Sequence, residues 1–358
     1  MNDPLKQRPN AFIKLGHHIR VVLHSNDPKD LSPSQKKLWK EMKEAAVKNP
    51  WFTEENVIAA LQGIAQMLEK EKIDQWISDY PQKYFLPAQP QTIAVIMAGN
   101  IPLVGFHDML CVLISGNRLL GKLSGQDTRL PVIIAEMLIE IEPDFSDFIV
   151  MTNETISGFD AVIATGSNNT SRYFEYYFGK YPHIIRKNRS SIAVLNGNET
   201  KESLELLAHD VFQYFGLGCR NVSKIFAPKD FNISKLPENW QYYEKLNRHS
   251  KYMNNYDYQK AIMLVNRIPH LDNGFALLTE NPSLSSPLSV IHYEYYDDIS
   301  LLQKQITQLG DQLQCISTTM ENLTEEVPLV KPGRTQMPDP SDYADGVDTL
   351  NFFFSLQG

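Results

Sequence analysis

The nine residues TIAVIMAGN, at positions 92–100, decide the fold class of this chain. Residues 92–97 form a short, almost wholly apolar run, which is typical of a strand that is covered on both faces. The next residues turn the chain, and residues 103–115 predict a buried helix. The pattern continues with strands predicted at 119–123, 147–152, 161–164 and 191–195, and with helices at 130–142 and 168–178. Strands that alternate with helices predict a mostly parallel sheet in an α/β fold.

The regions on either side of this pattern differ from it in their distribution of apolar residues. Residues 1–85 predict helices, because apolar residues recur there at helical spacing. The stretch 229–260 is polar and aromatic and has only weak periodicity. The tail 345–354 ends in an apolar run that favours a strand paired with a sheet. Beyond residue 197 the pattern predicts a helix, a strand and a second helix at 200–215, 222–227 and 299–313.

Composition excludes several classes of protein. The 358 residues carry 34 Lys and Arg against 42 Asp and Glu, a net charge of −8, whereas proteins that coat nucleic acid or anionic membranes need surplus positive charge. The apolar stretch 92–114 contains Asn100, His107 and Asp108, so it is too polar for a membrane span. The first ten residues lack the apolar core of a secretory signal. We therefore expect a cytoplasmic protein with no membrane span and no nucleic-acid partner.

The three cysteines are Cys111, Cys219 and Cys315, and none belongs to a CxxC pair, so neither a disulfide framework nor a zinc site is expected. Cys219 follows Gly218, and glycines let a backbone approach a ligand closely. The neighbouring Arg220 favours the thiolate, which is the nucleophilic form. From these residues alone two interpretations stay open, a catalytic nucleophile and a small buried side chain. Cys111 and Cys315 fall in apolar elements and are expected in the core.

Asn100 and the segment 165–167 follow predicted strands, at the edge where open α/β sheets bind ligands. The Asn100 amide is suited either to donating to an oxyanion or to bonding its own backbone in a turn. The small residues at 165–167 suit a phosphate at a helix start, although they are also ordinary capping residues. The chain contains neither GxGxxG nor GxxxxGK[ST], so the common nucleotide-binding fingerprints are absent.

Two further sets of residues are interpreted as structural. The basic cluster at 186–189 is assigned to a solvated face rather than to a phosphorylated ligand. His107, His183 and His209 have no partner at metal-ligand spacing. No metal site is therefore expected.

The order of these short motifs is more informative than any one of them. Ala98-Gly-Asn-Ile-Pro-Leu103, then Ser115-Gly-Asn117 with Gly121-Lys122, then Thr165-Gly-Ser167 and then Cys219 resemble the aldehyde dehydrogenase superfamily. Within that superfamily, the chain is most similar to the LuxC-type acyl-CoA reductases, the fatty acid reductases of bacterial bioluminescence and their relatives. The resemblance covers roughly residues 90–358 and is less clear in the N-terminal helices.

This resemblance implies two α/β domains, one for the cofactor and one for catalysis, with an N-terminal helical region and a C-terminal oligomerisation strand. The implied boundaries are 1–88 for the helical region packed on the cofactor domain, 89–197 for the dinucleotide-binding domain, 198–335 for the catalytic domain that carries the nucleophile, and 336–358 for a tail that extends a sheet or builds a dimer. A homodimer or a higher homo-oligomer is therefore expected.

The resemblance also implies roles for individual residues. Cys219 matches the family's nucleophile, and Asn100 matches the amide that forms an oxyanion hole with the N–H of that cysteine. The residues implied to bind the cofactor are Lys122, Ser124, Thr165, Gly166 and Ser167. Lys122 matches the lysine at the adenosine ribose, and the segment 165–167 matches the helix start beside the pyrophosphate.

Three departures from the superfamily's pattern refine this expectation. Ile185 occupies the position of the glutamate that activates water in hydrolytic members. Gly125 replaces the acid that follows the ribose lysine, which makes NADPH acceptable, with NADH as the alternative. The motif that grips the nicotinamide ribose is reduced to Ser283-Leu-Ser-Ser-Pro287.

We therefore expect an acyl-CoA reductase that converts a long-chain acyl thioester to an aldehyde with NADPH through an acyl–Cys219 intermediate. Its implied substrate is acyl-CoA or another acyl thioester. Two alternatives stay open. One is an aldehyde dehydrogenase that works in the oxidative direction, against which Ile185 argues. The other is a non-catalytic member that binds acyl-CoA or a nucleotide, which the altered ribose motif favours and the presence of Cys219 and Asn100 disfavours.

Overall fold

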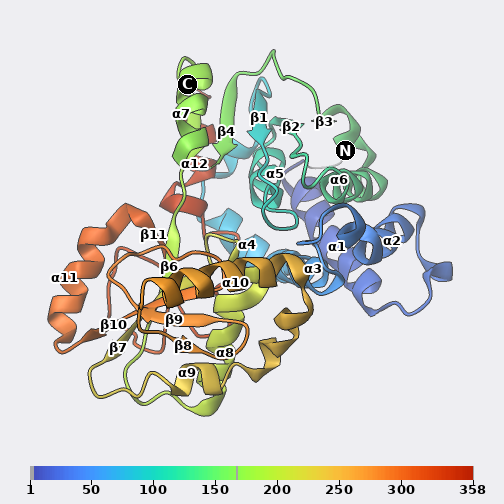
Figure 1. Cartoon of the computed structure of the whole chain (residues 1–358). Helices are drawn as coiled ribbons and strands as arrows, with labels where there is room; N and C mark the ends of the chain where they lie inside the picture. The colour runs from blue at the N-terminus through green and yellow to red at the C-terminus, as the bar shows by residue number, and fades with distance from the viewer. Residues whose placement is uncertain (1–3, 167, 358) are drawn as a thin grey trace. The chain divides into compact units, whose positions relative to one another are not determined.

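The computed structural model describes residues 4–166 and 168–357 of the chain. It divides into two compact units, of which the first comprises Met1–Asn188 with Met337–Gly358 and the second comprises Arg189–Gln336. Each unit is built on its own sheet (Figure 1). The α/β class that the sequence predicts is thereby confirmed.

The first unit carries a sheet of five parallel strands in the order β3-β2-β1-β4-β5. Its elements are α1 Pro4–His24, α2 Pro33–Lys48, α3 Glu54–Met67, α4 Lys70–Ser78, β1 Thr92–Ile96, α5 Phe106–Ile114, β2 Arg118–Lys122, α6 Leu130–Ile141, β3 Ile149–Thr152, β4 Ala161–Thr165, α7 Asn168–Phe178, β5 His183–Arg186 and α12 Thr349–Ser355. The helical N-terminus and the strands that begin with β1 agree with the sequence prediction.

Alternation along β1 sends successive side chains to opposite faces of this sheet. Ile93 and Val95 join the core that α1–α6 build on one face. Ala94 lies on the other face, where Phe174 and Phe178 of α7 cover it. Because both faces are covered, the strand can be wholly apolar, as its sequence indicates.

Polar caps fix where the N-terminal helices begin. Ser32 and Gln35 form a reciprocal capping box at the start of α2, which satisfies backbone donors that the helix itself leaves unpaired. Thr53 caps α3 in the same position, with its side chain accepting from the Asn56 N–H. The two capped helices pack against each other, and α2 also packs against α6 (Figure 1).

The second unit carries a sheet in the order β12-β11-β6-β7-β10-β9-β8, parallel except for the antiparallel pair β8–β9. Its elements are β6 Ser190–Val194, α8 Lys201–Phe212, β7 Val222–Pro228, α9 Lys235–Glu238, α10 Ser250–Val265, β8 Leu271–Asp272, β9 Leu277–Glu280, β10 Val290–Tyr296, α11 Ile299–Leu309, β11 Leu313–Thr318 and β12 Leu329–Val330 (Figure 1). Residues of α11 and of the segment between β11 and β12 form a core with β6 on one face.

Two expectations about boundaries need correction. The strand β6 belongs to the second sheet, so the structure divides the chain after Asn188 rather than after residue 197. The expected C-terminal strand is wrong, because residues 349–355 form α12. Asp348 caps that helix, and Leu350 and Phe353 are buried in the core of the first unit. Packing of this apolar face outweighs the local preference of the residues for a strand.

The weakly periodic stretch 229–260 also contains regular structure. Its largest element is α10, in which Tyr252, Tyr256 and Met263 are buried. The helix was not predicted because its apolar residues do not gather on one face.

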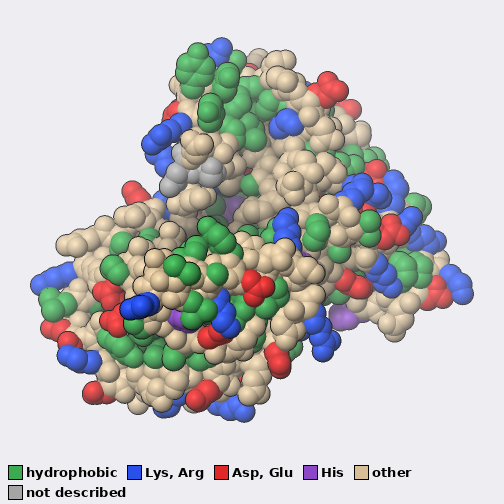
Figure 2. All heavy atoms as spheres, viewed as in Figure 1, with side chains coloured by type: hydrophobic (Ala, Val, Ile, Leu, Met, Phe, Trp, Pro, Cys, Tyr) green, Lys and Arg blue, Asp and Glu red, His purple; other side chains and the backbone are tan. Residues whose placement is uncertain are grey.

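The surface of the first unit carries an exposed aromatic group on α7. Tyr173, Tyr176 and Tyr177 are exposed, and Figure 2 shows hydrophobic side chains gathered where Figure 1 places this helix. On the face shown, acidic and basic side chains are interspersed. Within the described ranges, no helix combines the length and the apolar character needed to cross a membrane.

Candidate active site

Five of the predicted site residues of the first unit come together at the carboxyl ends of three neighbouring strands. Asn100 follows β1, Lys122 ends β2 with Ser124 just beyond it, and Thr165 ends β4 with Gly166 next. Ile96 pairs with Lys122 on one side and with Ala164 on the other, so the three strand ends are in register. Ser167 lies outside the described residues.

This edge is where ligands bind in open α/β sheets. The chain leaves β1 toward β2 on one side and later returns to place β4 on the other side, which makes the β1–β4 edge a topological switch point. The sequence prediction that Asn100 projects from a strand's carboxyl edge therefore agrees with its position. Asn100 is exposed there.

Buried contacts hold the loop that carries Asn100. Leu103 has a left-handed backbone with a φ of 58°, and its N–H donates to Asp127 Oδ2 at 2.8 Å. A Cβ atom at Gly99 would collide with the Ser124 side chain, so the two loops touch. Burial raises the pKa of the Asp127 carboxyl to about 6. The hydrogen bond from Leu103 to Asp127 thus holds the loop in place, although burial makes the charged form of this carboxyl group unfavourable.

The start of α7 is open beside the end of β4. A Cβ atom at Gly166 would approach the Thr170 and Phe174 side chains to about 3.0 Å, so only glycine leaves the start of α7 clear. The ammonium of Lys122 lies at the same edge, donating to the Asn153 carbonyl at 2.8 Å. Lys122 thus reaches toward the end of β3, whereas α7 follows β4. A helix start by itself favours an anion.

Cys219 lies on a loop of the second unit with an unusual backbone. After α8, the residues Tyr214, Phe215 and Gly216 have φ values of 52°, 60° and 78°. A left-handed conformation is uncommon for bulky residues and costs free energy that the surroundings must supply. Phe215 is buried, and its ring lies 4.3 Å from the ring of His249. The expected alternative of a buried side chain is wrong, because Cys219 is exposed.

Asn221 holds the loop from within. Its side-chain amide donates to the Gln213 carbonyl at 2.8 Å and to two further carbonyls at the end of α8, and its Oδ1 accepts from the Gly218 N–H at 2.8 Å. The Asn221 N–H in turn donates to the Gly218 carbonyl at 3.0 Å. In a trans peptide the C=O and the next N–H point in opposite directions. The N–H of Cys219 is therefore directed away from Asn221.

Ser191, on β6, fixes the peptide on the other side of Cys219. Its hydroxyl donates to the Cys219 carbonyl at 2.9 Å, and Cys315 Sγ lies 3.2 Å from Ser191 Oγ. A serine has one proton to donate, so the Cys315 thiol donates to Ser191. Burial raises the pKa of that thiol to about 11, which keeps it protonated. Cys111 and Cys315 are both buried, as the sequence predicts.

The reduced ribose motif lies at the same end of the second sheet as Cys219. Ser223 Oγ donates to the Leu284 carbonyl at 2.9 Å and contacts the Ser191 carbonyl at 3.4 Å. Ser191 is the residue that holds Cys219. Ser223 and Leu284, 61 residues apart in sequence, are therefore linked to the Cys219 loop through two serines at the starts of β6 and β7.

One site expectation is wrong. Arg186, assigned to a solvated face, is buried and forms an ion pair of 2.7 Å with Asp108, which is also buried. Its guanidinium also donates to Thr349 at 3.2 Å. The buried ion pair could not be predicted from the basic cluster, because Asp108 and Thr349 are both distant from Arg186 in sequence.

The histidines expected to be structural have protein partners. His107 Nε2 lies 2.8 Å from the Pro340 carbonyl, His183 Nδ1 lies 2.8 Å from the Tyr181 carbonyl, and His209 Nδ1 lies 3.0 Å from Tyr243 Oη. In the described part of the chain, no group of three or more His, Cys, Asp or Glu could hold a metal ion.

Sequence analysis did not identify Ser191, Asn221 or Ser223 as parts of the site. These are small or common polar residues whose partners are set only by the fold.

Comparisons with known proteins agree with this architecture. The model of a family described as acyl-CoA reductase (LuxC) matches residues 33–236. A search of curated proteins finds no match. Solved structures give many matches, among them three aldehyde-oxidising enzymes.

AldA, an indole-3-acetaldehyde dehydrogenase of P. syringae in complex with NAD+ and IAA, is 12% identical over 90% of this chain and 73% of that chain, with a TM-score of 0.61. Aldehyde dehydrogenase 21 of Physcomitrella patens, in complex with succinate, is 11% identical over 98% of this chain and 84% of that chain, with a TM-score of 0.66. The 1-pyrroline-5-carboxylate dehydrogenase of Thermus thermophilus is 11% identical over 98% and 80%, with a TM-score of 0.62. At these identities the likeness shows the fold, which is that of the aldehyde dehydrogenases.

Proposed function

The chain belongs to the acyl-CoA reductase (LuxC) family, and we propose that it reduces a long-chain acyl-CoA to the aldehyde with NADPH through a thioester on Cys219. Membership makes the protein an oxidoreductase that acts on acyl or aldehyde groups. The chain length, the choice of cofactor and the residue roles are our proposal.

The observation that supports the proposal most strongly is the presentation of Cys219. Its thiol is exposed, whereas Cys111 and Cys315 are buried. The peptides on both sides of Cys219 are fixed by Asn221 and Ser191. A reactive cysteine needs access to its substrate, and a fixed backbone places its N–H in advance of the reaction.

The first chemical step would form the thioester. The Cys219 thiolate attacks the acyl carbonyl carbon, and the carbonyl oxygen becomes an oxyanion. The N–H of Cys219 and the amide of Asn100 donate to that oxyanion. The bond from carbon to the CoA sulfur then breaks, and CoA leaves as its thiolate. Covalent catalysis of this kind divides one difficult step into two easier ones.

In the second step, NADPH would supply, when bound, the hydride that reduces the thioester carbonyl. The same two donors, on Cys219 and Asn100, stabilise the oxyanion that results. When the carbon–sulfur bond to Cys219 breaks, the aldehyde leaves and the thiolate is restored. Ile185, aligned with the water-activating glutamate of hydrolytic relatives, packs among apolar side chains of the first unit, so this position offers no base that would hydrolyse the thioester.

The residues that would hold the cofactor are those at the strand ends of the first unit. Lys122 would bind the adenosine ribose, and Thr165 and Gly166 would flank the pyrophosphate, together with Ser124 and Ser167. AldA of P. syringae has been solved with NAD+, which supports a nicotinamide dinucleotide. Gly125 supports NADPH, because open space surrounds it and no carboxylate there would repel a 2′-phosphate. The homo-oligomer and the cytoplasmic location stay predictions from the sequence.

Product analysis of the purified chain tests this function. We expect palmitoyl-CoA and NADPH to give the C16 aldehyde and free CoA, and Cys219→Ala to form no aldehyde while still binding NADPH. Cys111→Ala serves as the matched control, because Cys111 is buried in the first unit. Undiminished aldehyde formation by Cys219→Ala, or palmitic acid as the product, would contradict the proposal.

A further inference from the structure

A surplus of positive charge is confined to the first 48 residues of this acidic chain. They carry 10 Lys and Arg against 5 Asp and Glu, a net charge of +5. Residues 49–358 carry 24 Lys and Arg against 37 Asp and Glu, a net charge of −13. The net charge of the whole chain therefore conceals a basic region, and an asymmetry of this kind points to an interaction surface.

The outward side of α2 is where this charge reaches the surface. Leu38 and Met42 on its inward side are buried in the core of the first unit. Helical spacing gathers five exposed lysines on the opposite side. These residues, called the lysine face below, are Lys36, Lys37, Lys40, Lys43 and Lys48. The neighbouring helix α1 adds no negative charge, because Pro4–His24 contains neither Asp nor Glu.

Few carboxylates offset the charge of the lysine face. Lys37 Nζ lies 2.7 Å from Glu136 Oε2 of α6, and Lys40 Nζ lies 3.8 Å from Glu44 Oε2 of α2 itself. The other three lysines of the face form no ion pair with any residue that the structure describes. The face therefore keeps most of its positive charge.

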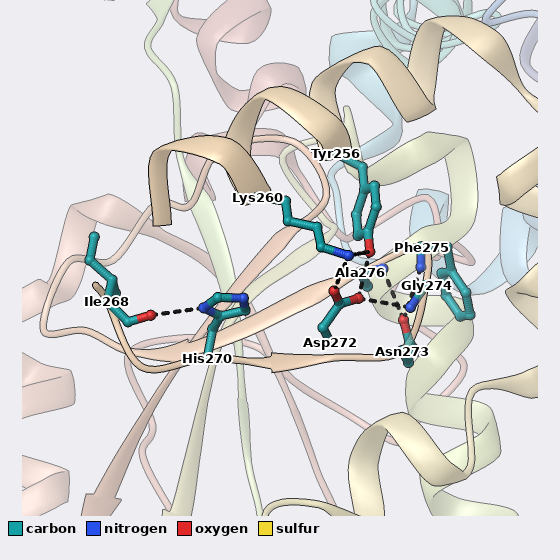
Figure 3. A network of polar contacts seen from close by, with 9 residues as sticks. All are labelled: Tyr256, Lys260, Ile268, His270, Asp272, Asn273, Gly274, Phe275 and Ala276. Atoms are coloured by element: carbon teal, nitrogen blue, oxygen red, sulfur yellow. Dashed lines mark hydrogen bonds and ion pairs between the residues drawn. The ribbon is translucent and has the colours of Figure 1, made fainter. Parts of the chain in front are cut away.

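A lysine of the second unit shows how a paired ammonium differs. Lys260 Nζ lies 2.7 Å from Asp272 Oδ2 and donates to Tyr256 Oη at 3.3 Å (Figure 3). The carboxylate there offsets the charge. Lys43 Nζ instead lies 3.6 Å from the centre of the Trp39 ring. An aromatic ring attracts the ammonium but leaves its charge unneutralised.

The composition of the lysine face fits a layer of anionic headgroups better than a folded protein. Protein interfaces are depleted in lysine and enriched in aromatic residues, Met and Arg. On α2 the one large apolar side chain that is exposed is Val47. A lysine ammonium is a point charge on a flexible stem, which suits phosphates that have no fixed arrangement. Clusters of four to eight basic residues on a helix are typical of sites for anionic lipids.

We propose that the lysine face docks the protein on the surface of a membrane that contains anionic phospholipids, with its ammonium groups against the lipid phosphates. Vesicle binding needs neither Cys219 nor a cofactor, so this inference stands apart from the proposed function. The two agree, because a long-chain aldehyde partitions into a bilayer. A reductase held at the membrane releases this product beside the phase that takes it up.

Sedimentation of the purified full chain with vesicles tests the proposal. We expect binding to vesicles of phosphatidylcholine mixed with phosphatidylglycerol, no binding to vesicles of phosphatidylcholine alone, and release at high salt, which screens exposed charges. The triple variant Lys36→Glu, Lys40→Glu, Lys43→Glu should bind at least about a hundredfold more weakly, because each lysine close to an anionic surface contributes roughly fivefold.

A second triple variant is the matched control. Lys235→Glu, Lys304→Glu, Lys331→Glu changes the net charge by the same amount at exposed positions of the second unit, and it should retain most of the binding. Thermal unfolding checks that both variants are folded, and the neutral triple Lys36→Gln, Lys40→Gln, Lys43→Gln replaces the first variant if its charges unfold α2.

Three results would overturn the proposal. They are failure of the wild type to bind the anionic vesicles, equal binding to both kinds of vesicle, and an equal loss of binding in the two triple variants. Binding to soluble poly-glutamate in place of the vesicles would also overturn it, and would assign the lysine face to an acidic protein.

Discussion

The hydroxyl of Ser191 donates a hydrogen bond of 2.9 Å to the backbone carbonyl of Cys219. Ser191 is fully buried at the start of β6, whereas the Cys219 side chain is exposed. The buried Ser191 thus fixes the orientation of the backbone carbonyl of Cys219, whose side chain is on the surface. Because the buried Cys315 thiol donates to the same hydroxyl, the orientation of Ser191 is fixed in turn.

Ser191→Ala is expected to slow acylation of Cys219 by about tenfold. Loss of an oxyanion donor itself costs about 10²–10³ in rate, and Ser191 acts only by holding the neighbouring peptide. Rapid-quench mass spectrometry with palmitoyl-CoA measures the rate. Ser191→Thr keeps the hydroxyl and should recover most of it, and an unchanged rate in Ser191→Ala would refute the positioning role.

Asn100→Ala is expected to lower kcat for aldehyde formation by about 10²–10³, as for other oxyanion donors. KM for NADPH should change little, because the amide is proposed to act on the reacting oxygen. Steady-state kinetics measure both constants. Asn255→Ala on α10, where the amide donates only to the Lys251 carbonyl, is the control. A change in Asn100→Ala confined to KM would assign this residue to binding instead.

Gly125→Asp is expected to raise KM for NADPH about tenfold and to leave KM for NADH nearly unchanged. A Cβ atom at Gly125 meets nothing within 4 Å, so the substitution fits without displacing neighbours. The new carboxylate would repel a 2′-phosphate. Gly125→Asn, of the same shape without the charge, is the control. Equal effects of both variants on the two cofactors would place the 2′-phosphate elsewhere.

Asp127→Asn is expected to flatten the pH dependence of stability between about pH 4 and pH 6. Burial raises the pKa of folded Asp127 from 3.8 to about 6, so the folded state binds the proton more tightly than the unfolded chain does. The stability from this group is full below about pH 4 and is lost as the pH rises through 6.

Thermal unfolding of wild type and Asp127→Asn between about pH 4 and pH 6 measures how the stability of each protein depends on pH. Asp160→Asn, which also removes a carboxylate that accepts a backbone N–H, that of Thr92, is the matched control. The same slope in Asp127→Asn and wild type would show that Asp127 does not titrate in this window.

Iodoacetamide at pH 8 is expected to modify Cys219 and to spare Cys111 and Cys315 in the folded protein. Burial raises the pKa of both spared thiols, and the thiolate is the form that reacts. Peptide mass spectrometry identifies the modified residues. In urea all three should react. Modification of Cys315 in the folded state would contradict the buried pair of hydrogen bonds that links Cys315 through Ser191 to the Cys219 carbonyl.

The parallel core of the fold could be predicted from the sequence because its signals are local. The run at 92–97 is apolar on both faces, and the structure covers both faces of β1. The C-terminal tail shows the opposite case. Its residues favour a strand locally, yet α12 forms because a helix buries Phe353 in the first unit. Tertiary packing of that kind leaves no mark in a short window of sequence.

The candidate site divides in the same way. Asn100 and Cys219 stand out because each sits beside glycines at the end of an element. Arg186 was placed on the surface because its partner Asp108 is 78 residues away. The role of Ser191 could not be predicted, since its partner in the loop at 219 is fixed only by the order of strands in the second sheet.

The most direct test of the account is mass spectrometry of the intact protein after incubation with palmitoyl-CoA in the absence of NADPH. We predict a single palmitoyl adduct, assigned by peptide mapping to Cys219 and removed on addition of NADPH with release of aldehyde. No adduct, or an adduct on another residue, would contradict the claim that Cys219 is the nucleophile of this reductase.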